Sequence, residues 1–256
     1  MKKMNGKKIL IVTAIVIAAC LVGGVIFGVL NALVADGAWE FGWSDYRYDE
    51  TNYEIGEGSI AATELTKIEI DWVDGEVEIV PCQDTYLSIT EKADGELPES
   101  AKVRWCVSED GKTLSIKYRK SSWFFAVGTG NRQKRLTVRI PERFFEQLTE
   151  LDVEADSANV SVKGIAADSL ELSTKSGAVN IDGCAFDQTD VETKSGNVAL
   201  RMAADASFVL DWETKRGKLS SDFAFVQDGA RYTVGNSGNT VSVETESGDL
   251  LLSRKE

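Results

Sequence analysis

The chain of 256 residues contains no histidine, only three prolines and only four cysteines. Without histidine it cannot form a Ser-His-Asp or Cys-His catalytic centre, and it lacks the commonest ligand of transition metals. Cys20 lies in an apolar run, and the other three cysteines, an odd number, cannot form a complete set of disulfides. Cys82 and Cys106 fall in neighbouring predicted strands, where they either pair or stay as buried free thiols.

Basic residues are also scarce, because 41 aspartates and glutamates outnumber 28 lysines and arginines and give a net charge of −13. The first 35 residues hold four lysines and no acidic residue, so the rest of the chain carries −17. A surface of this sign repels phosphate backbones, and we expect no nucleic-acid partner. The sequence has neither a phosphate-binding glycine loop nor a proper EF-hand loop or calcium-binding glycine repeat, so we expect no cofactor and no metal.

One long apolar run occupies residues 9–34, directly after the lysine-rich residues 1–8. It carries no charge and exceeds the roughly 20 helical residues that cross a bilayer. Lysines precede it and acidic residues follow it, which places the N-terminus in the cytoplasm and the rest of the chain outside. We therefore predict a single-pass protein of the cell membrane with an uncleaved signal anchor, followed by a juxtamembrane linker at residues 35–64.

Two processed forms compete with the uncleaved anchor. Residues 17–20, Ile-Ala-Ala-Cys, look like a lipoprotein signal that would lipidate Cys20, although the sequence stays apolar beyond it. Residues 33–35, Leu-Val-Ala, make a poor signal-peptidase site, and the apolar run is longer than that of a usual signal peptide. The length of the run favours the anchor.

The second half of the chain repeats a short phrase of alternating apolar and polar residues that ends in glycine. The phrases begin at Leu172, Val191, Trp212 and Val243, with steps of 19, 21 and 31 residues, and a degenerate copy begins at Val153. A second alternating run follows each glycine, so that strand, tight turn and strand recur. Such a period is typical of stacked units that bury their apolar faces against one another.

The repeats predict columns of like residues in the stack. The repeat glycines are Gly75, in a single early copy, and Gly177, Gly196, Gly217 and Gly248. We expect them at tight turns, which often need a positive φ. An inward threonine column is predicted at Thr174, Thr193, Thr214 and Thr245. Outward columns are predicted for the acidic Glu192, Glu213 and Glu244 and for the basic Lys175, Lys194 and Lys215.

From residue 65 onward, alternating runs predict strand after strand, and only residues 142–148 indicate a short helical turn. We therefore predict an all-β extracytoplasmic domain at residues 65–252. Its expected architecture is a β-solenoid-like stack of repeated short strands, preceded by one transmembrane helix. The longer third step indicates an inserted segment that includes a loop at residues 235–239.

At these residues the chain resembles DUF4097, a bacterial family of β-strand repeat domains also called putative adhesins. The resemblance rests on the Thr-Lys-Ser-Gly-x-Val phrases at residues 174–179 and 193–198, on the early phrase at residues 70–80 and on the lysine-flanked apolar run. It covers roughly residues 65–252. The resemblance implies a β-solenoid-like domain on a bacterial envelope, and it carries over no active site.

One segment departs from the acidic background. Residues 117–143 hold eight basic residues against one acidic residue, Glu142, and include a Trp-Phe-Phe run. Such a loop suits contact with a membrane interface or an anionic wall polymer, unless its aromatic side chains pack beneath the strands. The candidate contact residues are Trp123, Phe124, Phe125, Arg132, Lys134 and Arg135.

Paired carboxylates are the remaining catalytic option, as in glycan-cleaving enzymes. The candidates are Glu192, Glu213 and Glu244, or Asp152, Glu154 and Asp156. Their alternation with lysine is better explained by a solvated face. We therefore predict a non-catalytic envelope protein with an adhesion, scaffold or envelope-sensing role, whose partner is an envelope protein or an anionic wall polymer. The alternative is an accessory of envelope-stress signalling that acts through the membrane span.

Overall fold

The computed structural model describes residues 46–61, 64–121, 133–236 and 238–255. The predicted membrane span and the loop residues Trp123, Phe124, Phe125 and Arg132 lie outside these ranges. Within the described ranges, no helix combines the length and the apolar character that a membrane crossing requires. The chain divides into two units, and the larger one comprises residues 49–120 and 133–256.

The described part of the larger unit is built from strands and two single 3-10 turns, η1 (Glu99–Ala101) and η2 (Glu142–Phe144). The all-β prediction is therefore confirmed, and η2 lies where the sequence indicates a helical turn. The strands are β1 (Glu54–Ile55), β2 (Gly58–Ile60), β3 (Lys67–Cys82), β4 (Leu87–Ala93), β5 (Arg104–Val107), β6 (Thr113–Lys117), β7 (Lys134–Pro141), β8 (Glu150–Lys163), β9 (Ala166–Thr174), β10 (Val179–Asp182), β11 (Ala185–Thr193), β12 (Val198–Ala203), β13 (Phe208–Thr214), β14 (Leu219–Ser221), β15 (Val226–Asp228), β16 (Arg231–Val234), β17 (Asn239–Thr245) and β18 (Leu250–Lys255).

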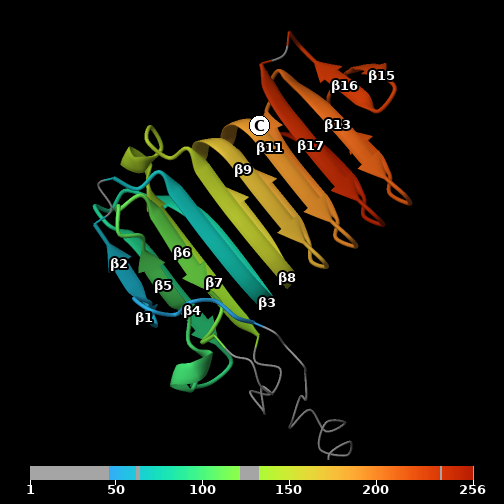
Figure 1. The fold of residues 1–256 in the computed structure, drawn as a ribbon. Helices are drawn as coiled ribbons and strands as arrows, with labels where there is room; N and C mark the ends of the chain where they lie inside the picture. The colour runs from blue at the N-terminus through green and yellow to red at the C-terminus, as the bar shows by residue number, and fades with distance from the viewer. Residues whose placement is uncertain (1–45, 62–63, 122–132, 237, 256) are drawn as a thin grey trace, which may run out of the picture. The chain divides into compact units, whose positions relative to one another are not determined.

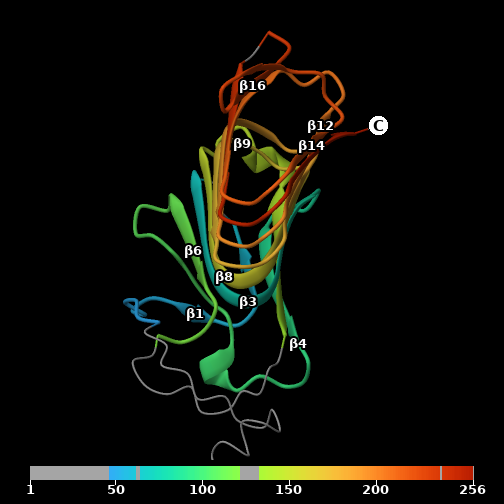
Figure 2. The ribbon, with the colours of Figure 1, turned by 90° about the vertical axis from the view of Figure 1, so that its right-hand side faces the viewer.

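The strands form one hydrogen-bonded sheet that bends into two facing flanks (Figure 2). The long strands β3 and β8 pass through the bend, so their first halves belong to one flank and their second halves to the other. Flank 1 follows the order β1, β5, β6, β3, β8, β9, β11, β17, β13, β16 and β15. Flank 2 follows the order β2, β4, β7, β3, β8, β10, β12, β18 and β14.

The repeat units stack in parallel register, but not in chain order. Thr193 is the register partner of Thr174 on one side and of Thr245 on the other, and Thr245 in turn pairs with Thr214. The fourth unit, β17 and β18, therefore lies between the second and the third, as Figure 1 shows for β11, β17 and β13. The predicted threonine column is confirmed, with its last two members exchanged.

The inserted segment of the third unit explains this order. It forms a hairpin of β15 and β16, and β16 pairs antiparallel with the outer edge of β13. The chain then returns through the loop predicted at residues 235–239 and enters as β17 between β11 and β13. Two edge-on aromatic pairs pack in this region, Phe208 with Phe223 and Phe225 with Tyr232. The insertion thus caps the end of the stack, which a repeat array needs for solubility.

The core lies between the flanks and follows the alternating pattern of the sequence. Val191 is 0 % exposed, Val198 1 % and Leu200 3 %, whereas Glu192 and Lys194 point outward. Each apolar side chain of this size contributes about 1.5–3 kcal/mol through burial. Because successive units supply the same positions, their side chains form continuous apolar rows along the stack.

The repeat glycines are required mainly by close stacking, which corrects the turn-based expectation for three of them. Only Gly75 and Gly177 have a positive φ, of 94° and 143°. A Cβ atom on Gly196 would lie 1.9 Å from the carbonyl oxygen of Gly177, and one on Gly217 would lie 1.9 Å from that of Gly248. The backbone of the neighbouring unit fills the space that a side chain would need.

The cysteines of the larger unit are free thiols, so the possible bond between Cys82 and Cys106 is not formed. Cys184 lies close to the backbone oxygen of Val162, with 3.5 Å between sulfur and oxygen. Burial raises the pKa of the Cys184 thiol to about 11. A thiol that keeps its proton is a poor nucleophile, so Cys184 is a packing residue.

Candidate functional site

Lys134, a predicted contact residue, lies in the interior instead of at the surface. Its side chain is 3 % exposed and forms an ion pair with Glu91, whose side chain is 5 % exposed, at an N–O distance of 2.5 Å. The ammonium group also donates hydrogen bonds to the backbone oxygens of Ala101, at 2.7 Å, and Tyr118, at 2.5 Å. The ammonium group is therefore held by two backbone oxygens and by the charge of the Glu91 carboxylate.

Aromatic rings complete the surroundings of Lys134. Its nitrogen lies 4.0 Å from the ring centroid of Tyr118 and 4.8 Å from that of Trp72, and these two rings pack edge to face. Burial lowers the pKa of Lys134 to about 8, against the opposing effect of Glu91. The lysine links the end of β6 to the start of β7, the two strands that border the predicted contact loop. Lys134 therefore ties the chain before residues 122–132 to the chain after them.

Arg135 is the predicted contact residue that the structure places at the surface. Its side chain is 54 % exposed, and its Nε donates to Glu76 Oε2 at 2.5 Å. The alternation of a strand explains the difference from Lys134, because neighbouring residues point to opposite faces of the sheet. The number of basic residues within 117–143 does not show which of these two side chains is buried and which is exposed.

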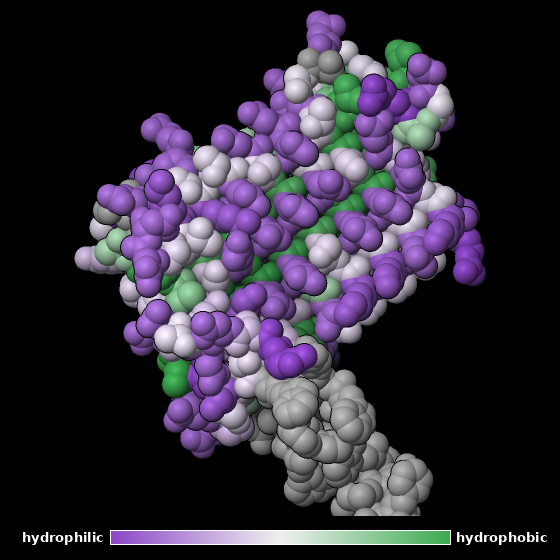
Figure 3. All heavy atoms as spheres, in the orientation of Figure 1, coloured by the Kyte–Doolittle hydropathy of each residue, from purple (hydrophilic) through white to green (hydrophobic). Residues whose placement is uncertain are grey.

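The outer face of flank 1 carries the predicted glutamate column. Glu244 of β17 is the register partner of Glu192 on β11 and of Glu213 on β13, so the three carboxylates lie on adjacent strands. Asp152, Glu154 and Asp156 occupy alternate positions of β8 and reach the same face. Figure 3 shows hydrophilic side chains in parallel rows across this view.

The basic column of the prediction is interrupted by Glu246. In the observed order, the backbone N–H of Glu246 donates to Thr193 and that of Lys215 donates to Thr245, so Glu246 lies between Lys194 and Lys215. Lys215 forms an ion pair with Glu246 at 3.1 Å, and Lys175 forms one with Asp156. The hydrogen bond from Lys215 lowers the pKa of Glu246, with a further contribution from Lys194. Strand order thus inserts a negative charge between two of the three lysines, whereas Lys175 and Lys194 remain neighbours.

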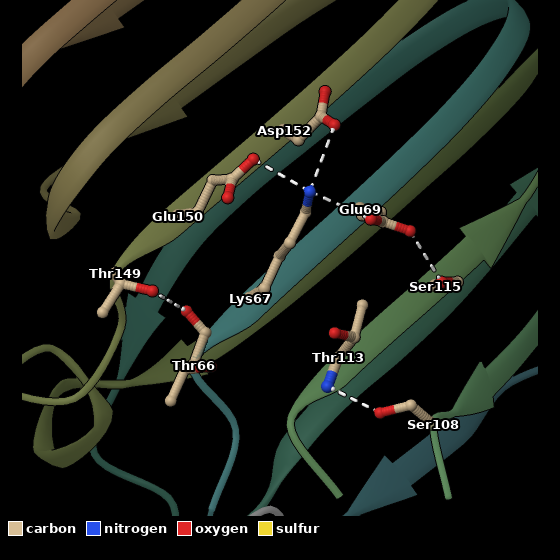
Figure 4. A network of polar contacts seen from close by, with 9 residues as sticks. All are labelled: Thr66, Lys67, Glu69, Ser108, Thr113, Ser115, Thr149, Glu150 and Asp152. Atoms are coloured by element: carbon tan, nitrogen blue, oxygen red, sulfur yellow. Dashed lines mark hydrogen bonds and ion pairs between the residues drawn. The ribbon is translucent and has the colours of Figure 1, made fainter. Parts of the chain in front are cut away.

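Lys67 is the centre of an acidic cluster on the same face (Figure 4). Its nitrogen lies 2.9 Å from Glu150, 3.0 Å from Glu69 and 3.9 Å from Asp152. The hydrogen bond to Glu150 raises the pKa of Lys67 above its usual range. Burial raises the pKa of Asp152, and Lys67 opposes this shift. No local sequence signal predicts this cluster, because its members come from strands β3 and β8, which are distant in the chain.

These surfaces present charged side chains to the solvent. In the described ranges, no group of three or more acidic or cysteine side chains has the arrangement of a metal site. The outward carboxylates stand on neighbouring strands, held at a regular spacing of about 4.8 Å by the backbone. Such rows can complement a partner surface along several strands at once.

One solved structure agrees with this architecture. The crystal structure of a putative cell adhesion protein from Clostridium sporogenes has a TM-score of 0.64 and 17 % sequence identity, over 79 % of this chain and 99 % of that one. A putative adhesin from Bacteroides fragilis has a TM-score of 0.35 and 10 % identity, over 78 % and 97 % of the two chains. No curated protein matches the sequence. The family described as Toastrack DUF4097 matches residues 65–200, more than half of the chain, which therefore belongs to this family.

Proposed function

We propose that this protein is a non-catalytic component of the bacterial envelope that binds other envelope material. Residues 9–34 hold it in the cell membrane with its N-terminus in the cytoplasm, and the larger unit projects outside the cell. The role is adhesion or scaffolding. The solved structure from Clostridium sporogenes that shares this fold is described as a putative cell adhesion protein, which is consistent with this role.

The observation that carries the proposal is the fixed array of outward side chains on the bent sheet. Continuous parallel pairing sets the position of each row, as in the partners Glu192, Glu244 and Glu213. A partner surface therefore meets a preorganised array, which limits the entropy lost on binding. The buried Lys134 adds a fixed base for the aromatic loop at residues 123–125, which we propose as a second contact.

The test uses the full-length protein reconstituted in lipid nanodiscs. Its binding to isolated bacterial cell walls is measured by co-sedimentation, alongside a variant with Trp123, Phe124 and Phe125 changed to serine. We expect the wild-type protein to sediment with the walls and the variant to bind less. Release of soluble saccharide from the walls is measured in the same samples, and we expect none.

Two outcomes would contradict the proposal. Absence of wall binding by the wild-type protein would remove the adhesive role and favour a signalling accessory that acts through its span. Saccharide release that disappears when Glu192, Glu213 and Glu244 are changed to glutamine would show that the protein is an enzyme. Equal binding by the serine variant, with its melting temperature unchanged, would move the contact from the loop to the flanks.

A further inference from the structure

A shallow groove of about 370 Å³ lies on the outer face of flank 2, on strands β7, β3, β8 and β10. Its floor includes Ser161 of β8, Asn180 of β10 and Ala178, which directly precedes β10. Longer charged side chains from β3, β7 and β8 stand around this floor. Because the floor strands are regular and paired on both sides, the groove is a built feature of the sheet.

The floor offers uncharged hydrogen-bonding groups. Ser161 and Asn180 are register partners on adjacent strands. The Ser161 hydroxyl oxygen is buried and has no hydrogen-bond partner in the described part of the chain. Asn159 accepts a hydrogen bond from the backbone N–H of Ala178 at 2.9 Å, which leaves its amide donors for another group. An unpaired buried hydroxyl costs free energy unless a ligand or water satisfies it.

The walls of the groove are electrically neutral. Arg135 pairs with Glu76 at 2.5 Å, and Lys163 pairs with Glu78 at 2.9 Å. The two cations and two anions cancel, although residues 36–256 together carry a charge of −17. A neutral groove in a strongly acidic protein does not attract a cation, and the surrounding field opposes an anionic chain.

We infer that this groove binds an uncharged, polyhydroxylated chain, that is, a neutral glycan. Serine hydroxyl and asparagine amide groups both donate and accept hydrogen bonds, as the hydroxyl groups of a sugar require. An extended peptide would use the free edge of a sheet, and β8 and β10 have no free edge at the groove. This inference rests on the proposed envelope-binding function and names the ligand class of one of its surfaces.

The test uses the full-length protein in nanodiscs and chitohexaose, an uncharged oligosaccharide, as the probe. Binding is followed by saturation-transfer NMR and titration, for the wild-type protein and for a variant that combines Ser161→Ala with Asn180→Leu. We expect about tenfold weaker binding by the variant, because two side-chain hydrogen bonds are removed. Ser242→Ala, on the outer face of flank 1, is the matched control and retains binding. Melting temperatures show whether each variant is folded.

The results that would overturn this inference differ from those that would overturn the proposed function. If the wild-type protein binds cell walls but neither chitohexaose nor maltohexaose, the inference is wrong and the envelope-binding function stands. Equal affinity of the wild-type protein and a folded groove variant also overturns it, as does tighter binding of an acidic oligosaccharide such as oligogalacturonate. Absence of both wall and oligosaccharide binding removes the function and the inference together.

Discussion

Gly248 and Gly196 touch so closely that a Cβ atom on Gly248 would lie 1.8 Å from the carbonyl oxygen of Gly196. The two residues are far apart in the chain, yet their units are neighbours in the stack. The same relationship links Gly196 to Gly177 and Gly217 to Gly248. The repeat glycine is therefore required for close stacking, and the contacts between successive glycines follow the order of the units.

We expect Gly248→Ala to lower the free energy of unfolding by about 3 kcal/mol, because the added methyl group forces two backbones apart. Gly238→Ala is the matched control, since no atom lies within 4 Å of its Cβ position and its φ is ordinary. The control should change stability by less than about 0.5 kcal/mol. Urea denaturation of both variants measures the difference. Equal effects would mean that the glycine column is not tightly packed.

Glu246 separates Lys194 from Lys215 in the observed order. Glu246→Lys would place four lysines side by side, at positions 175, 194, 246 and 215, and we expect a lower melting temperature in dilute buffer. Raising the salt concentration to about 1 M should remove most of the loss, because charges are then screened within about 3 Å. Glu213→Lys is the control. It makes the same change of charge but places the new cation beside Glu244, so its electrostatic effect has the opposite sign. A salt-independent loss would contradict the electrostatic explanation.

The Lys134–Glu91 pair predicts a stability change with pH. Lys134→Met leaves the Glu91 carboxylate buried without its partner, and we expect a loss of about 3–5 kcal/mol at pH 7. In the folded protein the Lys134 pKa is about 8, and in the unfolded chain it returns to 10.5. Between these values the unfolded state binds more protons, so this group makes the protein more stable as pH rises, by at most about 1.4 kcal/mol per pH unit.

The Lys134→Met variant lacks this contribution. The stability difference between wild type and variant should therefore widen from pH 8 to pH 10, as measured by urea denaturation at each pH. The other titrating groups are common to both proteins and cancel in the comparison. A constant difference would show that the lysine pKa is not lowered by burial.

The sequence was sufficient for the class of the fold, because period-two alternation and the repeated glycine phrase are local signals. It also predicted which residues share a column, since similar phrases place similar residues at equivalent positions of neighbouring strands. It could not predict the order of the units. That order depends on the hairpin of β15 and β16, because β16 pairs with one edge of β13 and β17 then pairs with the other edge, between β13 and β11.

The surfaces were harder to predict than the fold. Lys134 and Arg135 are adjacent in a basic run, yet one is buried against Glu91 and the other is exposed. Only the register of β7 with β4 and β3 decides which side chain points inward. The Lys67 cluster and the groove at Ser161 likewise combine residues from strands whose pairing is long-range.

Disulfide trapping tests the central claim, that the fourth repeat unit lies between the second and the third. In a chain with its four natural cysteines changed to alanine, Glu192→Cys is combined either with Glu244→Cys or with Glu213→Cys. Adjacent parallel strands lie about 4.8 Å apart, within reach of a disulfide, whereas positions two strands apart, at about 10 Å, are not. We predict rapid oxidation of the first pair and none of the second. Oxidation of the second pair alone would show that the units stack in chain order and would contradict this account.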